Sequence, residues 1–68
     1  MQKSRYEFES EFGSYINAAY SANSKSTAEY YLKLALHMID NSENIPSSLA
    51  KEYRYRVYDA ASDLGIDL

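Results

Sequence analysis

Residues 28–40 read AEYYLKLALHMID, and this stretch decides the fold of the chain. Its apolar residues recur three and four positions apart, which is the periodicity of an α-helix. They cover more than half of the helix circumference: Ala28, Tyr31, Leu32, Ala35, Leu36, Met38 and Ile39. A helix that is apolar over so much of its surface needs a neighbour on two sides. The stretch therefore predicts a central helix that packs between two others.

Helical signals continue on both sides of this stretch. The segments Ser4-Arg5-Tyr6-Glu7 and Ser26-Thr27-Ala28-Glu29 have the pattern of a capping box, which opens a helix. Pro46 fits the first turn of a third helix, where its missing N–H is no loss. Gly65 suits the left-handed conformation that ends a helix, with Ile66 placed to fold back. We predict an all-α chain with helices near residues 4–22, 27–40 and 46–64.

The length of 68 residues allows a single domain, spanning residues 1–68. A domain so small buries only about 60% of the surface of its unfolded chain, so natural examples usually add a disulfide, a metal or a partner chain. The chain has no Cys and one His, His37, which excludes disulfides and thiolate or His-rich metal sites. The prediction is therefore a small three-helix bundle or an intertwined helical dimer.

The first predicted helix carries more apolar surface than the other two helices need to cover. A helix of about 18 residues is about 27 Å long at 1.5 Å per residue. Pairing of this face with a second copy would add the stabilisation that a small domain lacks. We predict a homodimer with these self-association residues: Phe8, Phe12, Ile16 and Tyr20.

The charge balance argues against nucleic-acid partners, and the lack of a long apolar run argues against a membrane. Ten acids and seven bases give a net charge of −3, whereas domains that bind a duplex usually have a basic face. Basic and aromatic residues alternate over residues 51–58, a pattern that can bind single strands, but a helix separates them onto different faces. Residues 1–12 lack the apolar core of a signal peptide, and no apolar run could span a bilayer. We expect a cytoplasmic protein.

No pattern of catalytic residues is visible. His37 is the one side chain that titrates near neutrality by default, and no nucleophile or acid is arranged beside it. The glycines, Gly13 and Gly65, are isolated, so there is no phosphate-binding loop. Gly13 either permits a close helix approach or is simply tolerated. Glu7 and Glu11 share a helix face near its N-terminus, where acids complement the helix dipole. The sequence predicts no enzyme, no metal and no cofactor.

Tyrosine is the unusual residue of this chain, with eight in 68 residues. Some fall on the apolar stripes: Tyr15, Tyr31 and Tyr53. Others fall off them: Tyr6, Tyr30, Tyr55 and Tyr58. Each one alone is explained by the edge of a small core. As a set they favour a protein–protein surface, because Tyr offers a large, rigid, amphipathic contact area. The predicted partner-binding residues are Tyr30, Arg54, Tyr55 and Tyr58.

Three blocks of the sequence resemble the AraC negative regulators of Gram-negative bacteria. They are YEFESEF at residues 6–12, AEYYLKLALHMID at residues 28–40 and KEYRYRVYDA at residues 51–60. The resemblance covers most of the chain and rests on the general similarity of helical blocks. It carries over no catalytic residue and assigns no binding residue.

The resemblance implies a small cytoplasmic regulator that binds an AraC/XylS-type transcription activator. Such a regulator blocks the dimerisation or DNA binding of the activator and so damps virulence gene expression. Some members are described as resembling the small partners of the nucleoid protein H-NS, which implies H-NS as a further partner. The composition also fits another class, a phage- or plasmid-type protein inhibitor or antitoxin-like module with an unrelated protein target.

Overall fold

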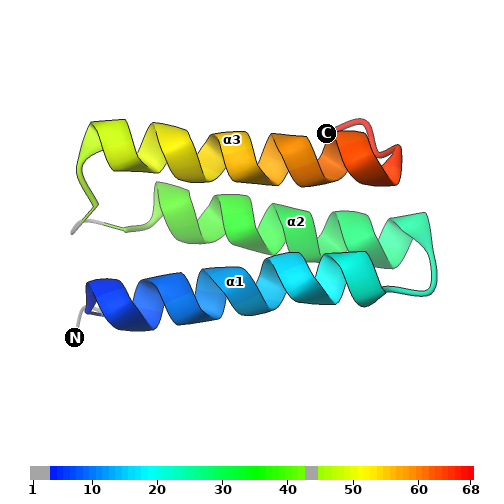
Figure 1. Ribbon diagram of the computed structural model, residues 1–68, viewed down its shortest axis with the longest axis horizontal. Coiled ribbons are helices and arrows are strands. Elements are labelled where there is room, and N and C mark those ends of the chain that lie inside the picture. The colour runs from blue at the N-terminus through cyan, green and yellow to red at the C-terminus, as the bar shows by residue number, and fades with distance from the viewer. Residues whose placement is uncertain (1–3, 43–44) are drawn as a thin grey trace.

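The computed structural model describes residues 4–42 and 45–68, which form three antiparallel α-helices (Figure 1). Helix α1 spans Arg5–Ser21, α2 spans Lys25–Asp40 and α3 spans Ser47–Leu64. The described residues contain no strand. The all-α prediction with three helices is confirmed, and the largest difference in a boundary is at the start of α2.

Helix α1 begins with the predicted capping box. The Ser4 hydroxyl accepts a hydrogen bond from the Glu7 N–H at 3.1 Å. In return, the Glu7 carboxylate accepts from the Ser4 N–H at 3.3 Å. Two N–H groups that have no partner inside a helix are thereby satisfied at once.

The capping box predicted for α2 is wrong, because Ser24 is the capping residue. The backbone of Ser24 is extended, and its hydroxyl accepts from the Thr27 N–H at 3.2 Å. This bond starts the helix at Lys25, before the predicted Ser26 can act as a cap. The carboxylate of Glu29 is used differently, in an ion pair with Lys33 at 2.7 Å on the same helix.

Helix α3 ends as the sequence predicts and begins slightly later. Pro46 precedes the first helical residue, Ser47, and lies outside the first turn. Gly65 has a φ of 70°, in the left-handed region. The Ile66 N–H then donates to the Ala61 carbonyl at 2.8 Å, which turns the chain back onto the bundle.

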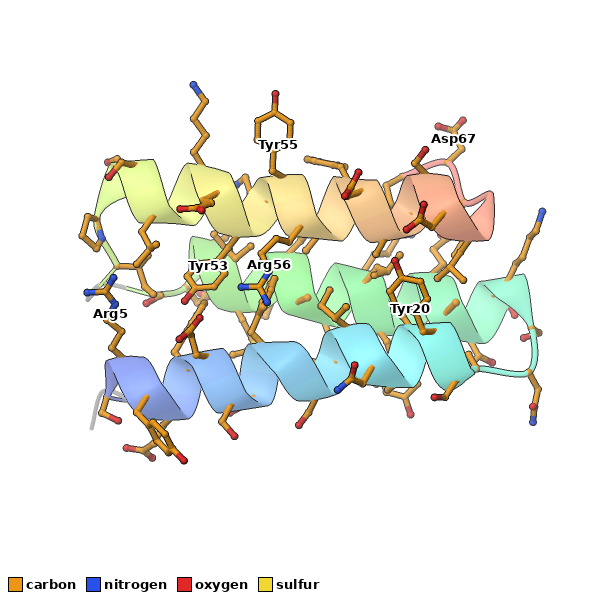
Figure 2. The ribbon with its side chains drawn as sticks, viewed as in Figure 1. Arg5, Tyr20, Tyr53, Tyr55, Arg56 and Asp67 are labelled. Carbon is orange, nitrogen blue, oxygen red and sulfur yellow. The ribbon has the colours of Figure 1, made fainter. Side chains whose placement is uncertain are left out.

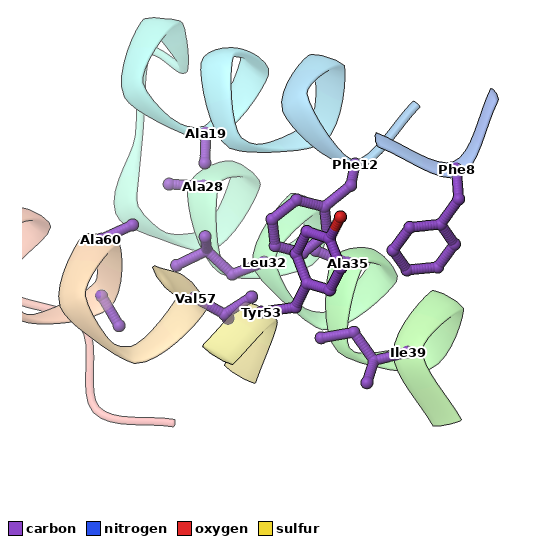
Figure 3. Packing of buried hydrophobic residues seen from close by; sticks show 11 residues of the cluster. Phe8, Phe12, Ala19, Ala28, Leu32, Ala35, Ile39, Tyr53, Val57 and Ala60 are labelled. Carbon is purple, nitrogen blue, oxygen red and sulfur yellow. The ribbon is translucent and has the colours of Figure 1, made fainter. Parts of the chain in front are cut away.

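Helix α2 lies between α1 and α3 in a flat bundle that measures 33 × 20 × 14 Å (Figure 1). It packs against both neighbours, whereas α1 and α3 touch each other much less. The buried core consists of Phe8, Phe12, Ala19, Ala28, Leu32, Ala35, Ile39, Tyr53, Val57, Ala60 and Ala61. Leu32 of α2 is fully buried at its centre (Figure 3). The prediction of a central second helix is confirmed.

An aromatic cluster joins α1 to α3 across one side of α2. The Tyr53 ring lies 5.1 Å from the Phe8 ring and 4.8 Å from the Phe12 ring, measured between centroids (Figure 3). The two Phe rings are stacked, with centroids 6.1 Å apart. Tyr53 thus covers the apolar face of α1 within the same chain.

This cluster corrects the predicted self-association stripe. Phe8 and Phe12 are 4% and 0% exposed in the single chain, so they are core residues of the bundle and offer no free surface. The apolar face of α1 is not in excess, because the Tyr53 ring of α3 covers Phe8 and Phe12. Ile16 is half-buried, and Tyr20 is 48% exposed at the edge of the bundle.

No helix within residues 4–42 and 45–68 combines the length and the apolar character that crossing a membrane requires.

The position of Leu32 generates a stability prediction. Leu32→Ala leaves a cavity in a fully buried site and should lower the free energy of unfolding by about 2–5 kcal/mol. Leu34→Ala makes the same chemical change at a half-buried position outside the core cluster and should cost much less. Urea unfolding followed by circular dichroism measures both. Equal losses in the two variants would contradict the central position of Leu32.

The two glycines should respond to alanine in opposite directions. A Cβ atom on Gly13 would meet nothing within 4 Å, so close helix approach does not require this glycine. Gly13→Ala should therefore stabilise the fold by about 0.5–1 kcal/mol. Gly65→Ala should destabilise it by about 1 kcal/mol or more, because φ is positive there, and the added Cβ would lie 3.2 Å from Lys25 Nζ. The melting temperatures of both variants test this. A lower melting temperature of Gly13→Ala would mean that this glycine has a packing role.

Candidate functional site

The tyrosines divide between core and surface as the sequence predicts. Those expected off the apolar stripes are exposed, with exposed fractions from 51% for Tyr58 to 83% for Tyr6. Of those expected on the stripes, Tyr53 is buried and Tyr15 and Tyr31 are half-buried. The pattern of the sequence therefore located most of the aromatic surface correctly.

The predicted partner-binding residues lie on α2 and α3, and we call them the α2–α3 tyrosine surface (Tyr30, Arg54, Tyr55 and Tyr58). Arg54 and Tyr58 are one helical turn apart, so they lie on the same flank of α3. Tyr55 follows Arg54 directly and points away from the bundle (Figure 2). Tyr55 and Tyr58 are three residues apart and so are neighbours on the exposed face of α3.

Tyr30 lies on α2, the helix next to α3. Arg54 Nη2 lies 2.8 Å from Asp40 Oδ1, and this pair marks the register between the two antiparallel helices. At a rise of 1.5 Å per residue, Tyr58 lies about 6 Å along the bundle from the pair, and Tyr30 lies about 15 Å along in the same direction. The Tyr30 ring packs edge-on against Tyr31, with centroids 5.6 Å apart. The structure thus brings Arg54 and Tyr58 close together. Tyr30 lies further along the bundle, and Tyr55 points away from it (Figure 2).

The charges on this surface are held by weak, exposed ion pairs. Arg54 binds Asp40, and Lys33 binds Glu29, with every side chain at least 38% exposed. Pairs of this kind contribute on the order of 0–1 kcal/mol, since water screens them and ordering costs entropy. Arg54 can therefore exchange Asp40 for an acidic group of another protein at little cost.

A second group of polar contacts, missed by the sequence analysis, spans α1 and α3. The guanidinium carbon of Arg56 lies 5.1 Å from the Phe12 ring centroid and 5.5 Å from that of Tyr53. Further along, the Tyr20 hydroxyl donates to Asp63 at 2.8 Å. Figure 2 shows Tyr53, Arg56 and Tyr20 filling the space between α1 and α3.

One signal in the sequence does point to this second group. Tyr53 and Arg56 are three residues apart, as are Glu9 and Phe12, so each pair shares a helix face. What the sequence does not contain is the register that sets one pair opposite the other. The interhelical contact of Tyr20 with Asp63 likewise joins residues 43 positions apart.

Two tyrosines in this region have a pKa above the ordinary value of 10.0. Burial raises the pKa of Tyr53 most, and its hydrogen bond to Glu9 and the charge of Glu9 raise it further, against the opposing charges of Arg56 and Arg5. For Tyr20 the hydrogen bond to Asp63 is the largest cause of the raised pKa, followed by partial desolvation. Both hydroxyls therefore act as hydrogen-bond donors over the whole neutral range.

Other parts of the described chain offer little for chemistry. A hollow of about 220 Å³ lies near the turn between α1 and α2, and its lining has one ionisable side chain, that of Lys25. Ligand pockets are usually about 300–1,000 Å³ and combine several polar groups. His37 is exposed and makes a side-chain hydrogen bond of 3.0 Å to Asn41. Among residues 4–42 and 45–68, no three His, Cys, Asp or Glu side chains are placed to share a metal.

Comparison of the chain with protein-family models, with curated proteins and with solved structures found no match.

The raised pKa of Tyr53 predicts a loss of stability in alkali. Above pH 10 the unfolded chain loses this proton while the folded chain keeps it, so the free energy of unfolding falls as the pH rises through the folded pKa. Tyr53→Phe removes the ionisable group and should make this fall shallower. Tyr55→Phe, at a ring that points away from the bundle, should show the wild-type slope. Urea unfolding across the alkaline range tests this, and identical slopes in all three proteins would contradict it.

Proposed function

We propose that this chain is a small negative regulator that binds an AraC/XylS-type transcription activator through the α2–α3 tyrosine surface. By covering the activator it would block dimerisation or DNA binding and damp the expression of virulence genes. The observation that carries the proposal is the exposure of Tyr30, Tyr55 and Tyr58 on two neighbouring helices, which Arg54 joins through its pair with Asp40. The resemblance of three sequence blocks to the AraC negative regulators supports the choice of partner.

The chemistry of the α2–α3 tyrosine surface suits protein binding. Tyr and Arg are enriched among the residues that contribute most to interfaces, since they combine apolar area with hydrogen bonding. A Tyr side chain has two rotatable angles, so ordering it on binding costs little entropy. Here the rings stand on regular helices, which lowers that cost further. A helix or groove of the activator is the natural counterpart.

The net charge of −3 supports action on the protein and not on its DNA. An acidic domain is repelled by phosphates and attracted by the basic surface with which an activator reads DNA. We further propose that the regulator acts in the cytoplasm as a homodimer. Of the stripe predicted for self-association, Ile16 and Tyr20 are the members that the bundle leaves accessible. H-NS is the further partner that the resemblance implies.

The test is co-purification of the tagged full-length protein with a co-expressed AraC/XylS-type activator, followed by a DNA-binding assay. The activator should be retained in stoichiometric amount and should lose its DNA binding. Recovery of an unrelated protein in its place, with the activator absent, would reject the proposal and favour the phage- or plasmid-type inhibitor class. Sedimentation of the free regulator measures whether it is a dimer.

Single substitutions then test the surface. Tyr58→Ala should weaken binding of the activator about tenfold or more, the effect expected of an interface hot spot. Tyr6→Ala is the matched control, because Tyr6 is 83% exposed but lies on α1, on the other side of α2. Affinities measured by calorimetry, with circular dichroism to verify folding, compare the two. A loss with Tyr6→Ala and none with Tyr58→Ala would place the binding surface elsewhere.

A further inference from the structure

Arg56 lies over two aromatic rings of the core. Its guanidinium lies within cation–π distance of Phe12 and Tyr53, at 5.1 and 5.5 Å from their centroids. Those rings are 0% and 3% exposed and belong to the core. The Arg56 side chain itself is 51% exposed. The guanidinium therefore lies against core rings, while about half of the side chain is open to solvent; Figure 2 shows Arg56 between α1 and α3.

Within residues 4–42 and 45–68, the guanidinium of Arg56 has an acidic neighbour but makes no hydrogen bond to it. A guanidinium carries five N–H donors. Its nearest acid is Glu9, with Nη1 and Oε1 3.8 Å apart, which is too long for a hydrogen bond. Among the residues that the structure describes, Arg56 donates no hydrogen bond. Arg54, two residues earlier and 44% exposed, shows the contrast, because it donates to Asp40 at 2.8 Å.

Glu9 lies near two groups of α3. Its carboxylate is 3.8 Å from Arg56 and close enough to the Tyr53 hydroxyl to raise the pKa of that hydroxyl. Contacts of Tyr53 with Phe8 and Phe12 also fix the distance between α1 and α3 at this level. Glu9 thus attracts the guanidinium electrostatically without occupying its donors. The N–H groups of the planar Arg56 guanidinium therefore stay without a hydrogen bond to Glu9.

We propose that Arg56 is a docking point for the carboxylate of an Asp or Glu side chain on a partner protein. A carboxylate is planar and can accept two parallel N–H bonds from the fork. A doubly charged phosphate is disfavoured, since Glu9 lies 3.8 Å away and would repel it most. The role depends on Arg rather than on positive charge alone, because an ammonium cannot form the paired bonds.

The surroundings of Arg56 specify the partner further. Asp63 lies along the same side of α3, seven residues on and held by Tyr20. A partner segment that sets one acid against Arg56 and a base against Asp63 would match the charges at both points. This site goes beyond the α2–α3 tyrosine surface, because Arg54 and Arg56 point about 200° apart around α3.

The test uses nuclear magnetic resonance on the full-length protein with two probes. N-acetylglutamate N-methylamide supplies one carboxylate, and its glutamine counterpart supplies none. The carboxylate probe should shift the Nε–Hε signal of Arg56 in a saturable way and leave that of Arg54 nearly unmoved. The glutamine probe should shift neither. An equal response of both arginines, or none at Arg56, would overturn the proposal.

Two variants and one further ion sharpen the result. Glu9→Gln removes the competing charge and should tighten binding of the carboxylate probe several-fold. The ring signals of Tyr53, which lies 5.5 Å from the Arg56 guanidinium, should also shift with the carboxylate probe. Arg56→Lys keeps the charge and should abolish this shift of the Tyr53 ring signals. If Arg56→Lys binds the carboxylate probe as tightly as the wild type, the paired N–H bonds of the guanidinium are not what binds it. Tighter binding of inorganic phosphate than of the carboxylate probe would show that the anion class is wrong.

Discussion

The contact of Tyr53 with Phe8 and Phe12 is the interaction on which the rest of the structure depends. Helix α2 packs against both of its neighbours, but α1 and α3 touch each other at few places. The three rings close this gap at one end of the bundle, with centroids 4.8–6.1 Å apart. They form the buried contact between the N-terminal half of α1 and α3 and set the distance between these two helices. They also provide the surface on which Arg56 lies.

Much of this fold follows from local patterns in the sequence. The apolar periodicity of residues 28–40 predicts a central helix, because only neighbours on both flanks can cover so wide a face. The ends set by Ser4 and Gly65 are predicted equally well, because each depends on a few adjacent residues. The start of α2 is not predicted by local pattern, since Ser24 and Ser26 have the same capping chemistry. Ser24 is the cap because its backbone is the one that is extended.

The candidate sites were predicted unevenly for a related reason. Exposure of a tyrosine follows from its position relative to its own helix stripe, so Tyr30, Tyr55 and Tyr58 were placed correctly. The roles of Phe8, Phe12 and Arg56 depend on which residues of α3 stand opposite α1. That register is set by packing between segments about 40 residues apart, and no local pattern encodes it. Two arginines separated by one residue therefore differ in partner, with Arg54 bound to Asp40 and Arg56 stacked on rings.

The up-and-down order of the three helices has a consequence for how the chain folds. Most contacts between helices join segments that follow one another along the chain, with few residues between them. Small helical domains of such low contact order fold in microseconds to milliseconds, because little loop entropy is lost before contacts form. The ring contacts of Tyr53 with α1 span the longest loop and are the natural last step. A chain with this topology spends little time with its aromatic core open, which limits its exposure to proteases and to aggregation during synthesis.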